Sequence, residues 1–290
     1  HLADIWPIRA LGKLRELNCG GTYKTWAKVS DLSPLQGLPI TALTCDLSSV
    51  SDLTPLRGMS LKKLDCGFTE VADLSPLRGM PLTYLKLTRT QVKDLAPLAG
   101  MHLTELNFNE THIADLSPLK GMPLKRLWCG WTRVTDLSPI QGMALESITF
   151  GGTRVEDIAP LSGMPLKTLE CRDSYVCDLS PLKGMRLNEI RLYGTRVSDL
   201  SPLAGMPLRV LYYDVRLFDE DERSLIASLA LTRLNGPIGA AVPVEETLKV
   251  LEARRHAALT FAQATSKLPP SERIEAVAAK LEELNGPGPV

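Results

Sequence analysis

The sequence has no excess charge and no long apolar run. Its 33 basic and 33 acidic residues give a formal net charge of zero, whereas nucleic-acid binders usually carry a basic excess or a basic face. No stretch reaches the about 18 consecutive apolar residues that a membrane-spanning helix needs. His1 is followed at once by sequence typical of a folded chain, so we expect no signal peptide within it. These absences predict a globular chain that binds no nucleic acid and does not insert into membranes.

The sequence also lacks the signatures of catalysis and metal binding. No P-loop, G-x-G-x-x-G, H-E-x-x-H or G-x-S-x-G motif occurs. His102 and His112 have no nucleophile at a recognisable spacing, so we expect both at the surface. No C-x-x-C pair or histidine cluster offers the ligands of a zinc site. We therefore expect no catalytic residue, no metal and no cofactor, and we do not expect an enzyme.

What the sequence has in abundance is a 21-residue repeat. Nine prolines (Pro34–Pro202) and nine glycines (Gly37–Gly205) keep this step in register. The unit reads L-x-x-L-x-[L/C/F]-x-x-T-x-V-x-D-L-S-P-L-x-G-M-P. A fixed period of this length with this leucine spacing is typical of leucine-rich repeats, in which each coil forms one strand and one short helical turn. The repeat predicts a solenoid of the α/β class, with a parallel sheet on the concave face and 3-10 turns on the convex face.

Each position of the repeat has an expected structural role. In the coil that begins at Leu82, alternation places Leu85 and Leu87 inward and Tyr84 and Lys86 outward. In D-L-S-P-L-x-G, the serine is the expected N-cap, the proline follows at N1, and the glycine can take the left-handed conformation that ends the turn. About three residues between cap and glycine suffice for one 3-10 turn. The threonine or serine before each valine is expected to hydrogen-bond backbone of the turn.

The repeats are irregular at both ends. A degenerate first copy with Asp4 and Pro7 precedes the nine, and a six-residue insertion follows its strand within Gly20–Lys28. This insertion, which carries Tyr23 and Trp26, is either a cap over the first strand or a second recognition site, and we favour the cap. After the last copy, residues 208–213 supply a tenth strand.

The domain organisation follows from this pattern. We expect a solenoid of about ten coils over residues 1–218, a capping helix over residues 219–236, and a two-helix appendage or linker over residues 237–290. The capping helix is indicated by acidic residues in its first turn and leucines at helical spacing up to Leu234, followed by Asn235-Gly236. Prolines at positions 243 and 269–270 bound the two amphipathic helices of the C-terminal segment.

Five of the six cysteines occupy one inward position of the repeat. These are Cys19, Cys45, Cys66, Cys129 and Cys171. The same position holds Leu87 or Phe108 in other coils, so we expect a column of free thiols in the core. Disulfides between neighbouring coils are disfavoured because no paired spacing appears. Cys177 is expected at the surface. Unpaired thiols and the missing signal peptide favour the cytoplasm, although the sequence does not establish the compartment.

The repeat resembles that of bacterial internalin-type proteins, whose coils also carry an aspartate–hydrophobic–Ser-Pro-Leu segment. The 21-residue step and the G-M-P-L segment are similar to arrays in very large bacterial multidomain proteins, which are often linked to serine/threonine kinases. The resemblance covers residues 3–218. It implies a leucine-rich repeat scaffold, and it transfers no ligand-binding residue to a position of this chain.

Candidate binding residues lie at the outward strand positions, which vary from coil to coil while the core positions do not. Exposed tryptophan and tyrosine beside arginine is the composition of a protein-interface hot spot. The predicted partner-binding residues are Lys86, Arg89, Glu105, Arg126, Trp128, Trp131, Glu170, Arg172, Arg191, Tyr193 and Tyr212. Two clusters stand out: the first comprises Arg126, Trp128 and Trp131 with Glu105 and Glu110, and the second comprises Glu170, Arg172, Arg191, Tyr193 and Tyr212. Gly130, Gly151 and Gly152 would leave a shallow place between these clusters. The alternative is that the aromatic rings cover glycine-thinned coils and the charges pair across strands.

Two functions fit this pattern. The first is a non-catalytic module that binds a protein or peptide through the outward sheet face. The second is a structural spacer or sensor segment of a large, kinase-linked multidomain bacterial protein with no ligand of its own. In both cases we expect a monomer in isolation.

Overall fold

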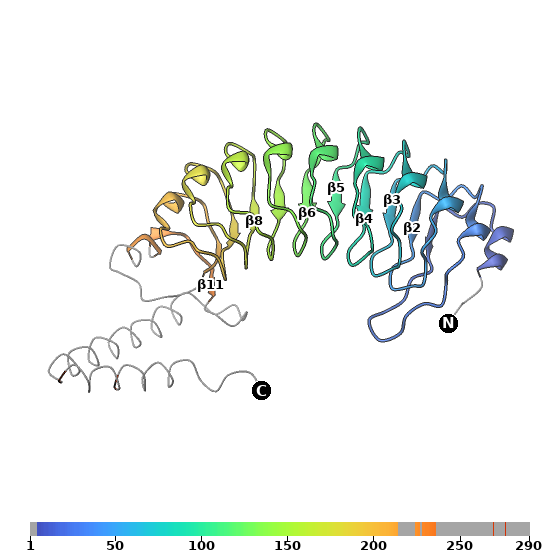
Figure 1. Ribbon diagram of the computed structural model, residues 1–290, viewed down its shortest axis with the longest axis horizontal. Helices are drawn as coiled ribbons and strands as arrows, with labels where there is room; N and C mark the ends of the chain where they lie inside the picture. The colour runs from blue at the N-terminus through green and yellow to red at the C-terminus, as the bar shows by residue number, and fades with distance from the viewer. Residues whose placement is uncertain (1–4, 214–223, 227, 236–268, 270–275, 277–290) are drawn as a thin grey trace.

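The computed structural model is a curved stack of coils that share one parallel sheet (Figure 1). The structure describes residues 5–213, 224–226, 228–235, 269 and 276. The sheet has 11 strands in sequence order. Their bounds are β1 Glu16–Asn18, β2 Ala42–Thr44, β3 Lys63–Asp65, β4 Tyr84–Lys86, β5 Glu105–Asn107, β6 Arg126–Trp128, β7 Ser147–Thr149, β8 Thr168–Glu170, β9 Glu189–Arg191, β10 Val210–Tyr212 and β11 Arg233–Asn235.

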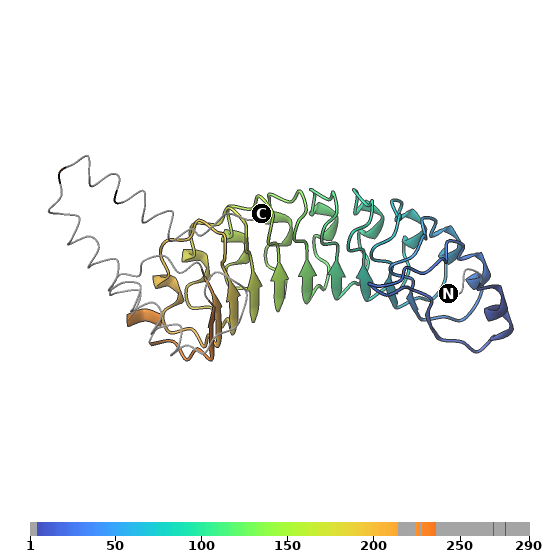
Figure 2. The same cartoon turned by 90° about the horizontal axis from the view of Figure 1, so that it is seen from below.

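The sheet lies along the concave face, where the strands stand side by side when the molecule is seen from below (Figure 2). Neighbouring strands pair with a shift of one repeat, so that Leu64, Leu85 and Leu106 are directly adjacent. These leucines are fully buried, whereas the residues on either side of each point outward. Residues that are 21 positions apart in the sequence therefore lie side by side on adjacent strands. The predicted parallel solenoid is confirmed.

Short 3-10 helices form the convex side. Their bounds are η1 Trp6–Ala10, η2 Ser33–Leu35, η3 Thr54–Leu56, η4 Ser75–Leu77, η5 Ala96–Leu98, η6 Ser117–Leu119, η7 Ser138–Ile140, η8 Ala159–Leu161, η9 Ser180–Leu182 and η10 Ser201–Leu203. Each interior turn ends at the repeat glycine, whose φ lies between 71° and 79°. This is the left-handed conformation that the sequence predicts for glycine.

The serine of the D-L-S-P segment is not the N-cap. The N-cap of η6 is Leu116, and Ser117 is already the first helical residue. The capping oxygens come from Asp115, whose Oδ1 accepts the Ser117 N–H at 2.7 Å and whose Oδ2 accepts the Ser117 hydroxyl at 2.7 Å. The prediction placed the cap one residue late because the longer aspartate side chain can reach forward over the intervening leucine.

The buried apolar residues of the described coils form one continuous core, to which each repeat position contributes a column of side chains. The hydroxyl of Thr111 donates to the Phe108 carbonyl at 2.7 Å, and the other threonines and serines of this position bond their own coil in the same way. All six cysteines are free, and Cys177 is exposed. Burial raises the pKa of the Cys129 and Cys171 thiols to about 12, so these side chains are inert apolar filling.

The C-terminal end differs from the expected helix over residues 219–236. Residues 224–226 and 228 are helical, but Leu234 lies in β11, which pairs with β10 in register with Leu211. The segment from Leu231 to Asn235 repeats the L-x-x-L-x strand signature without the D-L-S-P segment before it, and that omission concealed the strand. The sheet thus continues past residue 218. The predicted two-helix segment over 237–290 lies outside the described residues, apart from Pro269 and Ala276.

Candidate functional site: the concave sheet face

The concave face is built from the two outward residues of every strand and from the turn that follows it. Because the strands are in register, each outward position forms a column that crosses the whole sheet. The 11 predicted partner-binding residues all lie in these columns or in the following turn, and none is fully buried. Whether they bind a partner stays a prediction.

The first predicted cluster is organised by ion pairs within the face. Arg126 Nη1 lies 2.6 Å from Glu105 Oε1, on the strand beside it. Arg89 pairs with Glu110 in the next coil. Lys86 Nζ lies 2.9 Å from Asp65 Oδ2, and this hydrogen bond holds the pKa of Lys86 above its usual value although burial opposes the charge.

The aromatic members of the first cluster occupy two different places. Trp128 stands in β6 between Asn107 and Thr149, and it is half-buried. Trp131 lies in the turn beyond the strand, where half of its surface is exposed. Trp128 is therefore part of the sheet surface, whereas Trp131 lies beside the sheet, at the turn.

The second predicted cluster forms one connected network. Glu170 Oε1 lies 2.9 Å from Arg172 Nε, and its Oε2 lies 4.0 Å from Arg191 Nη1. Arg191 also pairs with Glu189 at 2.6 Å and stacks over the ring of Tyr212 at 4.7 Å. Stacking and pairing hold the guanidinium in place. The ring of Tyr193 is 40% exposed beside this network.

The turn after each strand carries an unusual backbone conformation. We call this set the left-handed column; it comprises Leu47, Phe68, Arg89, Glu110, Trp131, Gly152, Asp173 and Gly194, with φ from 50° to 70°. Hydrogen bonds to the next coil fix the conformation, such as Trp131 N–H to the Gly151 carbonyl at 2.7 Å. A residue with a Cβ in this region is strained by roughly 1–2 kcal/mol relative to glycine. The sequence analysis named several of these residues but could not foresee their conformation.

The protein's own side chains cover the glycines on the face. A Cβ added to Gly152 would lie 2.4 Å from Cδ2 of Trp131, and one added to Gly151 would lie 2.9 Å from Cγ of Arg172. The expected shallow place between the clusters is therefore filled by Trp131 and Arg172. This geometry matches the alternative in which large side chains cover glycine-thinned coils.

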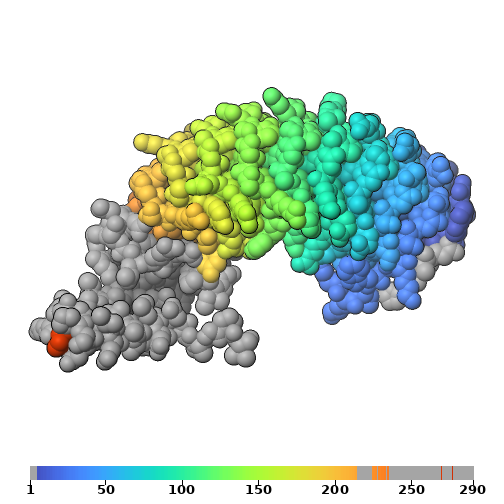
Figure 3. Space-filling model, viewed as in Figure 1, coloured from blue at the N-terminus to red at the C-terminus, as the bar shows by residue number. Residues whose placement is uncertain are grey.

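The inserted loop lies at the N-terminal end of the same face. It projects below the first coils in Figures 1 and 3, and it is anchored by hydrogen bonds from Gly21 N–H to the Asp46 carbonyl and from Ala27 N–H to the Leu47 carbonyl, both 2.8 Å. The Tyr23 ring meets the Phe68 ring edge to face at 5.9 Å. The loop therefore extends over two coils beyond β1, as a cap would. Tyr23 is nevertheless 82% exposed.

One carboxylate under this loop has an altered acidity. Burial, followed by repulsion from Asp65, raises the pKa of Asp46. The positive charge of Lys86 is paired with Asp65 and not with Asp46. The sequence analysis did not single out either aspartate. Their separation of 19 residues, close to one repeat, was the signal that places them in neighbouring coils.

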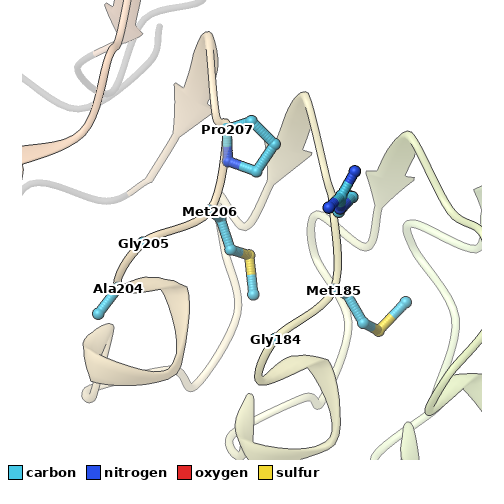
Figure 4. A pocket seen from close by; sticks show the side chains of 7 residues that line it. Gly184, Met185, Ala204, Gly205, Met206 and Pro207 are labelled. Atoms are coloured by element: carbon cyan, nitrogen blue, oxygen red, sulfur yellow. The ribbon is translucent and has the colours of Figure 1, made fainter.

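A surface hollow lies away from this face. It is lined by Gly184, Met185, Arg186, Ala204, Gly205, Met206 and Pro207, at the turns that follow η9 and η10 (Figure 4). Its lining contains no histidine, cysteine or carboxylate.

In the described part of the chain, no group of three histidines, cysteines or carboxylates is placed to hold a metal ion. No helix there has the length and apolar character that a membrane crossing needs. His102 and His112 are both exposed.

Comparisons with known proteins agree with this architecture. The structure is similar to that of the internalin InlF from Listeria monocytogenes, with a TM-score of 0.68 and 26% sequence identity over 80% of this chain and 70% of that chain. It is also similar to internalin C2 of the same organism, with a TM-score of 0.57 and 26% identity over 66% of this chain and 87% of that chain. A scan against protein-family models and a search of curated proteins found no match.

The fold and its repeated face define a leucine-rich repeat solenoid. More particularly, its solenoid is similar to those of bacterial internalins. This similarity supports a protein-interaction scaffold in general. The second predicted function, in a multidomain protein, has no counterpart among these comparisons.

Proposed function

We propose that the chain is a non-catalytic module that binds a protein or peptide partner through the concave sheet face. The observation that carries the proposal is the left-handed column. Glycine would occupy these positions without strain, as it does at Gly152 and Gly194. Instead, Phe68, Arg89 and Trp131 place large side chains there, and Arg89 and Trp131 are exposed. Stability alone does not favour strained residues that face solvent, whereas recognition does.

The composition of the two clusters supports the same function. Tryptophan, tyrosine and arginine are enriched among the few residues that dominate the binding energy of protein interfaces. On this face the arginines Arg126, Arg172 and Arg191 are already oriented by carboxylates. A partner would therefore meet an ordered surface and lose less entropy on binding.

The experiment compares the proteins retained by three forms of the chain: the wild type, a test variant and a control variant. The test variant replaces Trp128, Trp131, Tyr193 and Tyr212 with alanine. The control variant replaces four exposed convex residues, Arg57, Arg78, Lys120 and Lys183, with alanine. Proteins retained by the wild type and by the control, but lost from the folded test variant, support the proposal. Circular dichroism spectra establish that each variant is folded. Identical retention by all three forms contradicts the proposal.

The second candidate is a spacer without a ligand, and one observation favours it. Among the described residues, five of the seven ion pairs join residues 21 positions apart, so the charges of neighbouring coils largely satisfy one another. A spacer predicts that the concave substitutions change stability and retain every bound protein. The three-way comparison separates this outcome from recognition.

A further inference from the structure

A second outward column runs beside the left-handed column, two residues further along each coil. Four earlier coils carry Ser49, Glu70, Gln91 and His112 at this position, whereas four later coils carry Arg133, Arg154, Tyr175 and Arg196. We call these four residues the arginine edge, and all four are exposed. Backbone hydrogen bonds join this column from coil to coil, for example from Arg196 N–H to the Val176 carbonyl at 2.9 Å. The side chains therefore follow one another at about the 4.8 Å step of neighbouring strands.

The guanidinium groups of this edge have no acidic partner among the described residues. Arginines on the concave face pair with glutamates, but no ion pair involves Arg133, Arg154 or Arg196. The aspartates that follow three positions later serve the turns instead. Asp136, for example, accepts the Ser138 N–H and the Ser138 hydroxyl, both at 2.7 Å.

Aromatic rings flank these arginines. The Arg196 guanidinium stacks over the Tyr175 ring at 4.3 Å, which leaves the edge of the planar group free to donate hydrogen bonds to a carboxylate. Trp131, two residues before Arg133, is 50% exposed and strained. Between residues 27 and 130, a fully described stretch, no large apolar side chain is exposed. Exposed rings and the unpaired arginines of this column thus coincide in the same coils.

We propose that the arginine edge binds an acidic polypeptide segment of a partner protein, along a surface that adjoins the concave sheet face at Trp131. Carboxylates at the pitch of the coils would each receive charge-assisted hydrogen bonds from one guanidinium. Trp131 and Tyr175 would receive an apolar residue of the same segment. An acidic polypeptide is favoured over a nucleic acid because the chain has no net positive charge to attract a long polyanion.

The test measures binding of a fluorescein-labelled heptapeptide, Glu-Glu-Glu-Trp-Glu-Glu-Glu, by fluorescence anisotropy with the whole chain. The double variant Arg133→Glu/Arg154→Glu should weaken binding at least about tenfold. The matched control, Arg57→Glu/Arg78→Glu, makes the same charge change on two exposed convex arginines of adjacent coils and should leave the affinity within about twofold. A peptide with glutamine in place of glutamate should not bind.

Four outcomes overturn the inference. They are no binding of the acidic peptide at millimolar protein, equal losses in the two double variants, tighter binding of single-stranded oligothymidylate than of the peptide, and an equal loss in Trp128→Ala. The last variant alters the concave face only, so it also separates this inference from the proposed function. Thermal melts of each variant establish that it is folded.

Discussion

Trp131 combines three properties that rarely occur together in one residue. It has a φ of 56°, half of its surface is exposed, and its ring lies over Gly152. The conformation is held by the hydrogen bond of its N–H to the Gly151 carbonyl, so a substitution at this position keeps the backbone left-handed. The cost of any Cβ here is therefore measurable separately from the loss of the ring.

We expect Trp131→Gly to be more stable than Trp131→Ala by about 1 kcal/mol. Both variants lose the indole, but only alanine retains a Cβ in the left-handed region. The free energy of unfolding from urea titrations at a constant m value gives the difference. The control is Arg126, an extended residue of β6, where the alanine variant should be the more stable of the two. Equal stability of the two Trp131 variants contradicts the strain argument.

At this scale the sequence predicted directions better than conformations. Alternation along the strand correctly placed Leu85 inward and Tyr84 and Lys86 outward. It could not show that Phe68 and Trp131 are left-handed, because residues of this size rarely adopt that region and no local signal marks them. A comparison between coils does carry the signal, because the same repeat position holds glycine at 152 and 194.

The strand and the turn are the elements that the repeat determines most fully. Once coils stack in register, residues 21 positions apart become neighbours, and this rule yields the pairs Asp65–Lys86 and Glu105–Arg126 from the sequence alone. The rule failed at β11, because the chain from Leu211 to Leu234 takes 23 residues and lacks the D-L-S-P turn. The missing turn, together with leucines at helical spacing, concealed the strand.

In several turns the aspartate makes the stability of the turn depend on pH. Hydrogen bonds from the serine hydroxyl and the serine N–H lower the pKa of Asp115 and Asp178 below the usual 3.8; in Asp136 the N–H contributes more than the hydroxyl. A carboxylate with a lowered pKa in the folded state stabilises the protein above the unfolded pKa. This contribution disappears as the pH falls through the folded pKa. Stability should therefore decline below about pH 4.

We expect the triple variant Ser117→Ala/Ser138→Ala/Ser180→Ala to melt at a lower temperature than the wild type at pH 7. The difference should narrow at pH 3, because protonation of the aspartates below their usual pKa of 3.8 removes part of the wild type's advantage. Thermal melts at the two pH values provide the measurement. Alanine is compatible with the turn, since η5 and η8 begin with Ala96 and Ala159. Ser162→Ala, at an exposed site outside these turns, is the control, and a constant difference across pH would contradict the mechanism.

The described coils form a one-dimensional array, in which each strand pairs with the strands of the neighbouring coils. Its sheet order follows the sequence from β1 to β11. In such an array a central coil transmits the coupling between two halves, whereas a terminal coil contacts one neighbour. Burial follows the same distinction: Leu127 of β6 is fully buried, and Leu17 of β1 is partly buried.

We therefore expect the same substitution to act differently at the middle and at the end. Leu127→Ala should destabilise the array by about 2–5 kcal/mol, and it should broaden the unfolding transition or divide it in two. Leu17→Ala should cost less than half as much and leave one transition, because the first coil can fray without disturbing the rest. Urea titrations followed by circular dichroism, with hydrogen exchange to locate the opened coils, test this. Equal losses at both positions would mean that the array unfolds as one unit, with coupling between coils stronger than the stability of any single coil.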